Sequence, residues 1–206
     1  AAEVADAAAL CDLHIAATER EAGLPAGLLR SIALAESGRW LADRRESRPW
    51  PWTVTSGPEE HYYLPSRTAA LDKVRELRAR GRRNIDVGCM QVNLHYHGDA
   101  FPSPEAAVDP ARNVAYAAGF LGRLRDETRS WGLAVARYHT SEAARGRDYR
   151  DRVFRLWRDE RVRLAKLRRA GRPAAVGRAA SDGRGPWLWL RGANAAVPGP
   201  GSVAVP

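Results

Sequence analysis

Glu36 has a carboxyl group placed where it could act as a general acid. It stands one helical turn beyond Ile32, on the apolar side of a helix expected over residues 24–38. Burial beside apolar side chains and the negative end of the helix dipole both disfavour the ionised carboxylate. A carboxyl that stays protonated near neutral pH can donate a proton to a leaving group. The alternative is a solvated glutamate at the end of a surface helix.

A second group of polar residues lies in residues 84–97, N-I-D-V-G-C-M-Q-V-N-L-H-Y-H. Asp86 and Gly88 flank an expected bend. In a strand, Gln91 and Asn93 would share a face and could present amide donors and acceptors to a polar ligand. The alternative is a hairpin in which these amides only satisfy backbone groups.

Tyr138 lies near the end of a short helix expected over residues 130–139, W-G-L-A-V-A-R-Y-H after the capping residue Ser130. A tyrosine in this position is either part of the core, with its hydroxyl at the surface, or a phenol directed at another residue of a site. The sequence leaves both interpretations open.

Aromatic and imidazole rings are also concentrated in the first half of the chain. Five of them could form a wall on which sugar rings stack, or could simply cover the core: Trp40, Trp50, Trp52, Tyr62 and Tyr63. His95 and His97 have the i, i+2 spacing of a strand face, but no further ligand set accompanies them. We therefore expect packing roles or positions at the rim of a cleft for both histidines, and neither a metal ion nor another cofactor.

Helical periodicity predicts a mostly α fold of the α+β class with a β-hairpin insertion. The helices are expected over residues 4–21, 24–38, 66–81, from 103, and over 109–128, 130–139 and 148–169, with the hairpin over 40–65 and a short broken strand over 84–93. Residues 1–160 would form a single domain. Residues 161–206 would be a basic tail: the end of the last helix, then a largely disordered segment that contains W-L-W-L at 187–190.

The formal net charge of +9 belongs mostly to this tail. Residues 1–160 hold 24 Arg and Lys against 23 Asp and Glu, whereas 161–206 hold 9 against one. A nearly neutral domain does not predict a specific nucleic-acid partner. No stretch approaches the ~20 consecutive apolar residues of a membrane span. The two cysteines, Cys11 and Cys89, are either a disulfide of an oxidising compartment or two inert core thiols.

Four of these segments, taken in order, resemble the soluble-type (SLT) lytic transglycosylases of the lysozyme-like superfamily, which cleave the glycan strands of bacterial peptidoglycan. The matching segments are L-A-E-S-G at 34–38, D-V-G-C-M-Q-V-N at 86–93, D-P-A-R-N-V-A-Y-A-A-G-F-L at 109–121 and A-V-A-R-Y-H at 134–139. The resemblance extends from about Cys11 to Trp157. It implies a lysozyme-like fold in which a glutamate at a helix end precedes a β-hairpin.

The resemblance also implies roles for individual residues. Glu36 would be the catalytic acid and then the base, and Ser37 would orient Glu36 or a sugar substituent. The substrate cleft would be lined by Met90 and Gln91, with Asn93 beside them. Tyr138 would form a hydrogen bond near the Glu36 carboxyl, and Asn113 would support the site.

The chain departs from the family pattern at two positions. His139 follows Tyr138 where the family commonly has asparagine, so the role of the amide in substrate binding would be taken by imidazole or not be filled at all. Cys89 replaces the leucine of G-L-M-Q, which favours a bridge to Cys11 in an exported protein.

The expected reaction is cleavage of the MurNAc–GlcNAc β-1,4 bond to 1,6-anhydro-MurNAc ends, with Glu36 as the single acid/base. Asp86 occupies the place of the second carboxylate in lysozyme-type enzymes, so a hydrolytic muramidase using both acids is the first alternative; Asp86 could instead bond only to hairpin amides. The second alternative is a non-catalytic glycan-binding scaffold. The implied location is the periplasm or cell envelope, with peptidoglycan strands as substrate and a flagellum, pilus or secretion system as a further partner.

Overall fold

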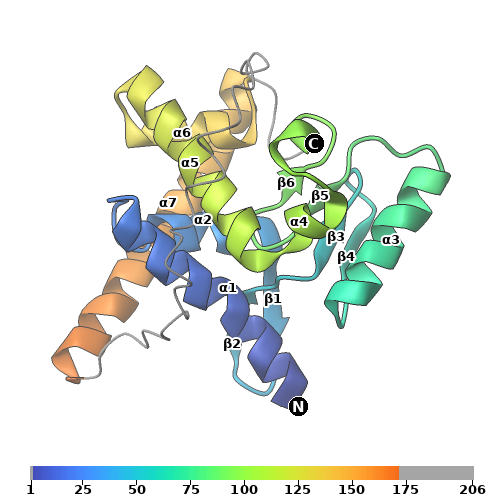
Figure 1. Ribbon diagram of the computed structural model, residues 1–206. Coiled ribbons are helices and arrows are strands. Elements are labelled where there is room, and N and C mark those ends of the chain that lie inside the picture. Colours follow the sequence, from blue (N-terminus) through green and yellow to red (C-terminus); the bar gives the residue numbers. More distant parts are fainter. Residues whose placement is uncertain (1, 172–206) are drawn as a thin grey trace.

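The computed structural model describes residues 2–171, and in this range the chain forms helices together with small antiparallel sheets (Figure 1). The expected mostly helical fold of mixed helix and strand is confirmed. The expected disorder of residues 172–206 and the W-L-W-L segment lie outside the described residues. The α-helices are α1 (Ala2–Glu21), α2 (Leu28–Ser37), α3 (Arg67–Ala79), α4 (Pro104–Val108), α5 (Pro110–Thr128), α6 (Trp131–His139) and α7 (Ala143–Arg169).

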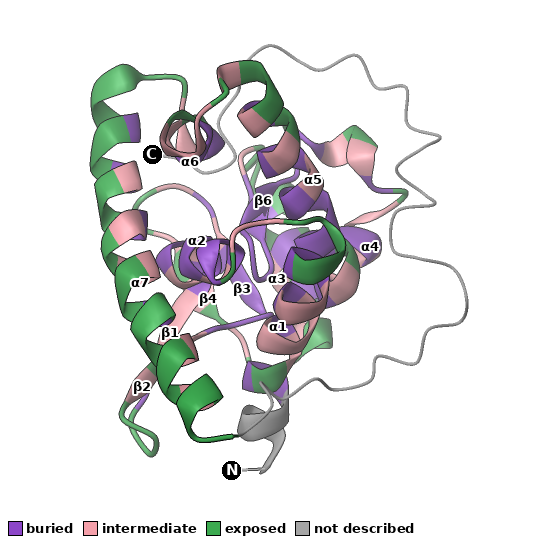
Figure 2. Cartoon of the chain, turned by 90° about the vertical axis from the view of Figure 1, so that its left-hand side faces the viewer, coloured by how far each residue is buried: buried purple, intermediate pink, exposed green. Residues whose placement is uncertain are grey.

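Helix α2 lies at the centre of the molecule and carries the residue of most chemical interest, Glu36, in its last turn. Its apolar face, which includes Leu28, Leu29, Ile32 and Ala33, is buried. The long helix α7 packs along α2, with its inner face against the core and its outer face exposed (Figure 2). This packing forms one wall of the cleft described below.

Helix α2 begins at Leu28, three residues later than the expected start at Pro25. Gly27 has a φ of +80°, which is outside the helical region, and it has no side chain to cap the helix. The carboxylate of Glu19, on α1, accepts hydrogen bonds from the backbone N–H groups of Gly27, Leu29 and Arg30 at 2.9, 2.7 and 3.2 Å. A carboxylate from a distant turn thus satisfies the positive end of the α2 dipole, which no local sequence signal shows.

The β-structure contains two hairpins where one was expected over residues 40–65. Strands β1 (Gly38–Leu41) and β2 (Glu46–Pro49) form one pair, which turns at Arg45 with a φ of +52°. Strands β3 (Thr53–Thr55) and β4 (His61–Tyr63) form the other, which turns at residues 56–60, within the expected hairpin range. Strand β3 also pairs with β5 (Asp86–Val87), and β5 with β6 (Val92–Asn93), giving the order β4-β3-β5-β6.

Helix α7 begins at Ala143, five residues before the expected start at Asp148. The added turn contains Gly146, whose low helix propensity weakens the helical pattern there. A Cβ atom at Gly146 would lie 3.2 Å from the carbonyl oxygen of Ala136, so glycine lets α6 and α7 approach closely. The helix ends at Arg169, as predicted.

Cys11 and Cys89 form a disulfide between α1 and the bend that follows β5. Both residues are buried, and 78 positions separate them in the sequence. A cross-link that closes so long a loop stabilises the fold chiefly by restricting the unfolded chain. The disulfide also fixes the bend that carries Met90 and Gln91 against the helical layer.

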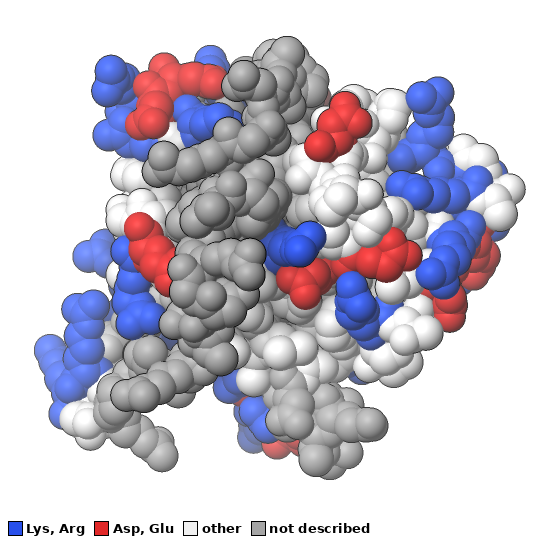
Figure 3. All heavy atoms as spheres, in the orientation of Figure 1, with Lys and Arg blue, Asp and Glu red and all other residues white. Residues whose placement is uncertain are grey.

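Charged residues are distributed in two distinct ways over the described surface. Positive and negative side chains alternate over α3, whereas blue side chains gather over the C-terminal end of α7 (Figure 3). None of the helices in the described range is both long and apolar enough to cross a membrane.

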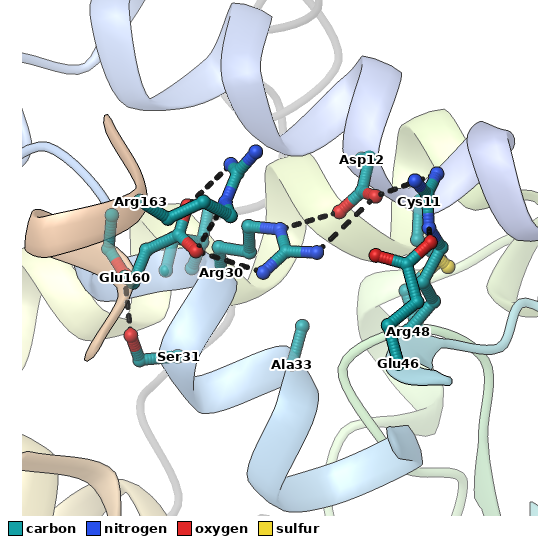
Figure 4. A network of polar contacts seen from close by, with 12 residues as sticks. Cys11, Asp12, Arg30, Ser31, Ala33, Glu46, Arg48, Glu160 and Arg163 are labelled. Atoms are coloured by element: carbon teal, nitrogen blue, oxygen red, sulfur yellow. Dashed lines mark hydrogen bonds and ion pairs between the residues drawn. A yellow bond between two sulfur atoms is a disulfide. The ribbon is translucent and has the colours of Figure 1, made fainter. Parts of the chain in front are cut away.

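A polar network joins α1, α2 and α7 through the guanidinium of Arg30, whose side chain is 11% exposed (Figure 4). Arg30 donates to Asp12 on α1 and to Glu160 on α7, both at 2.8 Å. Arg163 donates two further hydrogen bonds to the Glu160 carboxylate. On the other side, Arg48 of β2 lies 3.5 Å from Asp12. The network fixes the position of α7 relative to α2.

Candidate active site

A cleft of about 690 Å³ opens between the end of α2, the β3–β4 hairpin and the first half of α7. It is lined by residues of five parts of the chain: Ala35, Glu36 and Gly38; Thr55, Gly57, Pro58, His61 and Tyr63; Asp86 and Gln91; His139; and Arg145, Asp148, Tyr149, Arg152 and Arg155. The structure therefore brings Glu36, Asp86, Gln91 and His139 together, as the sequence predicted.

Glu36 is half-buried at the floor of this cleft. Burial raises the pKa of its carboxyl to about 7, against the opposing effects of a hydrogen bond from Tyr149 and the positive charge of Arg152. This agrees with the expectation that burial favours the protonated form of Glu36, and about half of the carboxyl is protonated at pH 7. A carboxyl with such a pKa can both give and take a proton at that pH.

Tyr149 donates the hydrogen bond that holds the Glu36 carboxyl, through its hydroxyl to Oε1. The sequence arguments did not single out this residue. The one available signal was its position four residues before Val153, which puts a polar hydroxyl on the buried face of α7. Its ring stacks on the His139 imidazole, with centroids 4.4 Å apart and planes inclined by 6°.

Tyr138 does not bond to Glu36, contrary to the role that the family resemblance implied. Its ring is fully buried, and its hydroxyl donates to the backbone carbonyl of Met90 at 3.0 Å. The negative charge of Glu36 contributes to raising the Tyr138 pKa, after the larger effect of burial, so the two groups are still electrostatic neighbours. Tyr138 supports the cleft wall, and Tyr149 takes the contact that was expected of it.

Asp86 faces the same cleft, and its exposed fraction is only 2%. Its Oδ1 accepts a hydrogen bond from the side-chain amide of Asn93 at 2.9 Å, across the β5–β6 pair. Burial raises the pKa of Asp86 well above its usual range, and the nearby charge of Glu36 raises it further. Both effects favour the protonated form of Asp86 over the carboxylate.

The bend between β5 and β6 depends on Gly88 and Asn113. Gly88 has a φ of +83°, and a Cβ atom there would lie 2.6 Å from the Asn113 amide nitrogen. The Asn113 amide donates to the carbonyl groups of Val87 and Ala107 and accepts from the N–H of Met90, each at 2.9 Å. Asn113 thus supports the site without entering it, as expected.

Gln91 lies in this bend with a φ of +47°, so it does not share a strand face with Asn93. Its amide donates to the carbonyl groups of Thr53 and Gly88 and accepts from the Thr55 hydroxyl at 2.6 Å. The side chain lines the cleft, but its amide is already engaged with the protein. Gln91 therefore contributes a rigid surface to the cleft more than free hydrogen-bonding groups.

Three residues that the resemblance assigned to substrate contact are fully buried and do not line the cleft: Ser37, Met90 and Asn93. The Ser37 hydroxyl donates a hydrogen bond to the Cys89 carbonyl at 2.7 Å, and this bond joins α2 to the bend. The same hydroxyl accepts a hydrogen bond from the N–H of Trp50. The side-chain oxygen Oδ1 of Asn93 accepts hydrogen bonds from the backbone N–H groups of His95 and Tyr96. These side chains shape the walls from behind because the bend and α2 turn them into the core.

Of the aromatic residues considered for a sugar-stacking wall, only Tyr63 lines the cleft. Trp50 and Trp52 belong to the core, and Trp40 is 61% exposed away from the cleft. His97 packs among aromatic rings and pairs through Nδ1 with the Tyr116 hydroxyl at 2.8 Å. Within residues 2–171 there is no group of three or more His, Cys, Asp or Glu side chains that could hold a metal ion.

His139 contributes a neutral ring to the site. Burial, and to a smaller extent the positive charges of Arg145 and Arg152, lower its pKa to about 4. At neutral pH the imidazole is uncharged and covers one face of the Tyr149 ring. The asparagine of the family pattern is thus replaced here by a flat ring that positions the tyrosine.

We expect Tyr149→Phe to raise the pKa of Glu36 above about 7. The hydrogen bond from Tyr149 favours the charged Glu36 carboxylate. Its removal therefore favours the protonated form of Glu36. Titration of the Glu36 carboxyl carbon by NMR, with and without the substitution, measures this change. Tyr96→Phe, at an exposed tyrosine outside the cleft, is the control and should leave the titration unchanged. An unchanged or lower pKa in Tyr149→Phe would contradict the assigned contact.

Comparison of the chain with protein-family models, with curated proteins and with solved structures found no match.

Proposed function

We propose that the protein is a lytic transglycosylase of bacterial peptidoglycan with a lysozyme-like fold. The observation that carries the proposal is the carboxyl of Glu36, with its pKa raised to about 7, which lies on the floor of an open cleft and is held by Tyr149. The fold supports it through a glutamate in the last turn of α2, followed directly by β-hairpins that form the opposite wall.

The proposed reaction needs one acid. The Glu36 carboxyl protonates the oxygen of the MurNAc–GlcNAc β-1,4 bond as the bond to the anomeric carbon breaks. The 6-hydroxyl of the same muramic acid then attacks that carbon, and the Glu36 carboxylate accepts its proton. The products are a 1,6-anhydro-MurNAc end and a free GlcNAc hydroxyl, and Glu36 returns to its starting state.

The state of Asp86 favours this reaction over hydrolysis. A second carboxylate must be ionised to act as a nucleophile or to activate water. Burial raises the pKa of Asp86 well above its usual range, which disfavours the carboxylate, and its Oδ1 accepts a hydrogen bond from the Asn93 amide, so Asp86 is poorly suited to either role. A hydrolytic muramidase remains the second candidate because Asp86 lines the same cleft as Glu36.

The proposed location is the periplasm or another part of the cell envelope. The buried Cys11–Cys89 disulfide supports an oxidising compartment, where such bonds persist. Peptidoglycan glycan strands would be the substrate, and an envelope-spanning assembly would be a further partner.

The test is mass spectrometry of the products that the full chain and Asp86→Asn release from purified peptidoglycan. We expect anhydro-muramyl ends from both proteins, with cleavage by Asp86→Asn within about tenfold of the unsubstituted chain. Reducing ends, together with loss of cleavage in Asp86→Asn, would establish the muramidase instead. Absence of cleavage between pH 5 and 8 would overturn both enzymatic functions.

A further inference from the structure

Helix α7 presents three arginines to the cleft, opposite the acids of α2 and β5. Arg145, Arg152 and Arg155 all line it and are exposed, together with Asp148. Spacings of seven and three residues place the arginines along one side of the helix. One wall of the cleft is thus a row of guanidinium groups.

Two of these guanidinium groups are not neutralised within the described part of the chain. Arg152 and Arg155 form no ion pair with any residue in the range 2–171. Arg145 forms an ion pair with Glu142, in which the guanidinium lies 3.8 Å from the carboxylate and both side chains are partly exposed. Elsewhere on α7, by contrast, Arg150, Arg158 and Arg163 are paired with acids of the same helix. Unpaired arginines on the cleft side are suited to a ligand.

The acids of the cleft do not balance these charges. Glu36 and Asp86 both have raised pKa values and carry less negative charge than ordinary carboxyls do, so Asp148 is the remaining acid that faces the three guanidinium groups. The positive charge of Arg152 also lowers the pKa of Glu36, Tyr63, His139 and Tyr149. The field of Arg152 therefore reaches the floor and both walls, where a ligand would lie.

We propose that Arg152, assisted by Arg145 and Arg155, binds carboxylates of the peptide substituents on the glycan and so selects acidic glycan strands over neutral ones. This inference rests on the proposed function and assigns its substrate specificity to named residues. Arginine is the side chain best suited to the task, since its planar guanidinium can form two parallel hydrogen bonds to one carboxylate.

Binding of a carboxylate at Arg152 would also favour the acid form of Glu36. The Arg152 charge favours the ionised Glu36, and an anion that neutralises this charge removes the effect. An acidic strand would therefore raise the pKa of the catalytic carboxyl when it binds. A neutral strand in the same cleft would not.

Binding is measured with the full chain carrying Glu36→Gln, so that the strands are not cut. The two probes are uncross-linked glycan strands with their native peptides and the same strands with every carboxylate converted to a methylamide. We expect the native strands to bind at least tenfold more tightly. Adding Arg152→Gln should remove most of this preference, whereas Arg158→Gln, on an exposed arginine outside the cleft, should retain it.

A second measurement uses the active chain. The alkaline limb of the cleavage–pH profile should lie at higher pH for native strands than for methylamide strands. Equal affinity for both probes, or an equal loss of affinity for both in Arg152→Gln, would overturn the inference. The proposed function would stand in that case if the active chain still cleaved the strands. Strands that are neither bound nor cut would overturn both.

Discussion

Replacing Glu36 with glutamine is expected to lower the rate of peptidoglycan cleavage by about a thousandfold, the middle of the range for general acid catalysis. Glutamine has nearly the shape of the protonated acid, and its side-chain oxygen can still accept a hydrogen bond from the Tyr149 hydroxyl, so the fold should persist. It cannot transfer a proton to the leaving oxygen or take one from the 6-hydroxyl. Release of soluble muropeptides measures the loss, and circular dichroism verifies the fold.

The matched control is Glu127→Gln, the same chemical change on an exposed residue of α5 outside the cleft. It should leave cleavage unchanged. Cleavage by the unsubstituted chain should also fall about tenfold per pH unit above pH 7, because the acid form of Glu36 is lost above its pKa of about 7. Full activity in Glu36→Gln, or a rate that still rises beyond pH 8, would show that another group supplies the proton.

Replacing Arg30 with methionine is expected to lower the free energy of unfolding by about 3 kcal/mol, the lower end of the range for breaking a buried ion pair. Arg30 is the shared partner of Asp12 and Glu160, and the Glu160 side chain is only 3% exposed. Without the guanidinium, Glu160 keeps Arg163 as a partner, which places the cost at the low end. Urea denaturation followed by circular dichroism measures the change.

Arg158→Met is the control, since its ion pair with Asp159 is solvated, with side chains 72% and 68% exposed. It should cost less than about 1 kcal/mol. The double variant Arg30→Met with Glu160→Leu removes the buried carboxylate as well and should recover part of the loss. Equal destabilisation by Arg30→Met and Arg158→Met would show that the network of Figure 4 contributes no more than a surface pair.

Most of the helices and the residue at the centre of the site could be predicted because their signals are local. Ser66, Ser103, Asp109 and Ser130 each accept a hydrogen bond from the backbone of the helix they begin, as their side chains indicated. The raised pKa of Glu36 followed from one apolar stripe and its place at the end of that stripe.

The errors occurred where a residue distant in the sequence decides the local structure. The start of α2 depends on Glu19, from another helix, and the start of α7 on close packing of Gly146 against Ala136. Gln91 and Asn93 do not share a strand face because Gln91 still belongs to the bend before β6, and Asn113, twenty or more positions away, holds that bend. Periodicity along the chain contains none of these contacts.

The sequence by itself determined that this chain forms a mostly helical domain and presents a buried glutamate at the end of a helix, because hydrophobic spacing and capping are properties of neighbouring residues. Only the tertiary structure decided which phenol bonds to that glutamate. Tyr138 and Tyr149 both lie near it, and the crossing of α6 and α7 turns the first toward Met90 and the second toward Glu36. It also decided that Asp86 is buried, with a raised pKa, and that the arginines of α7 line the cleft, since both depend on packing between distant segments.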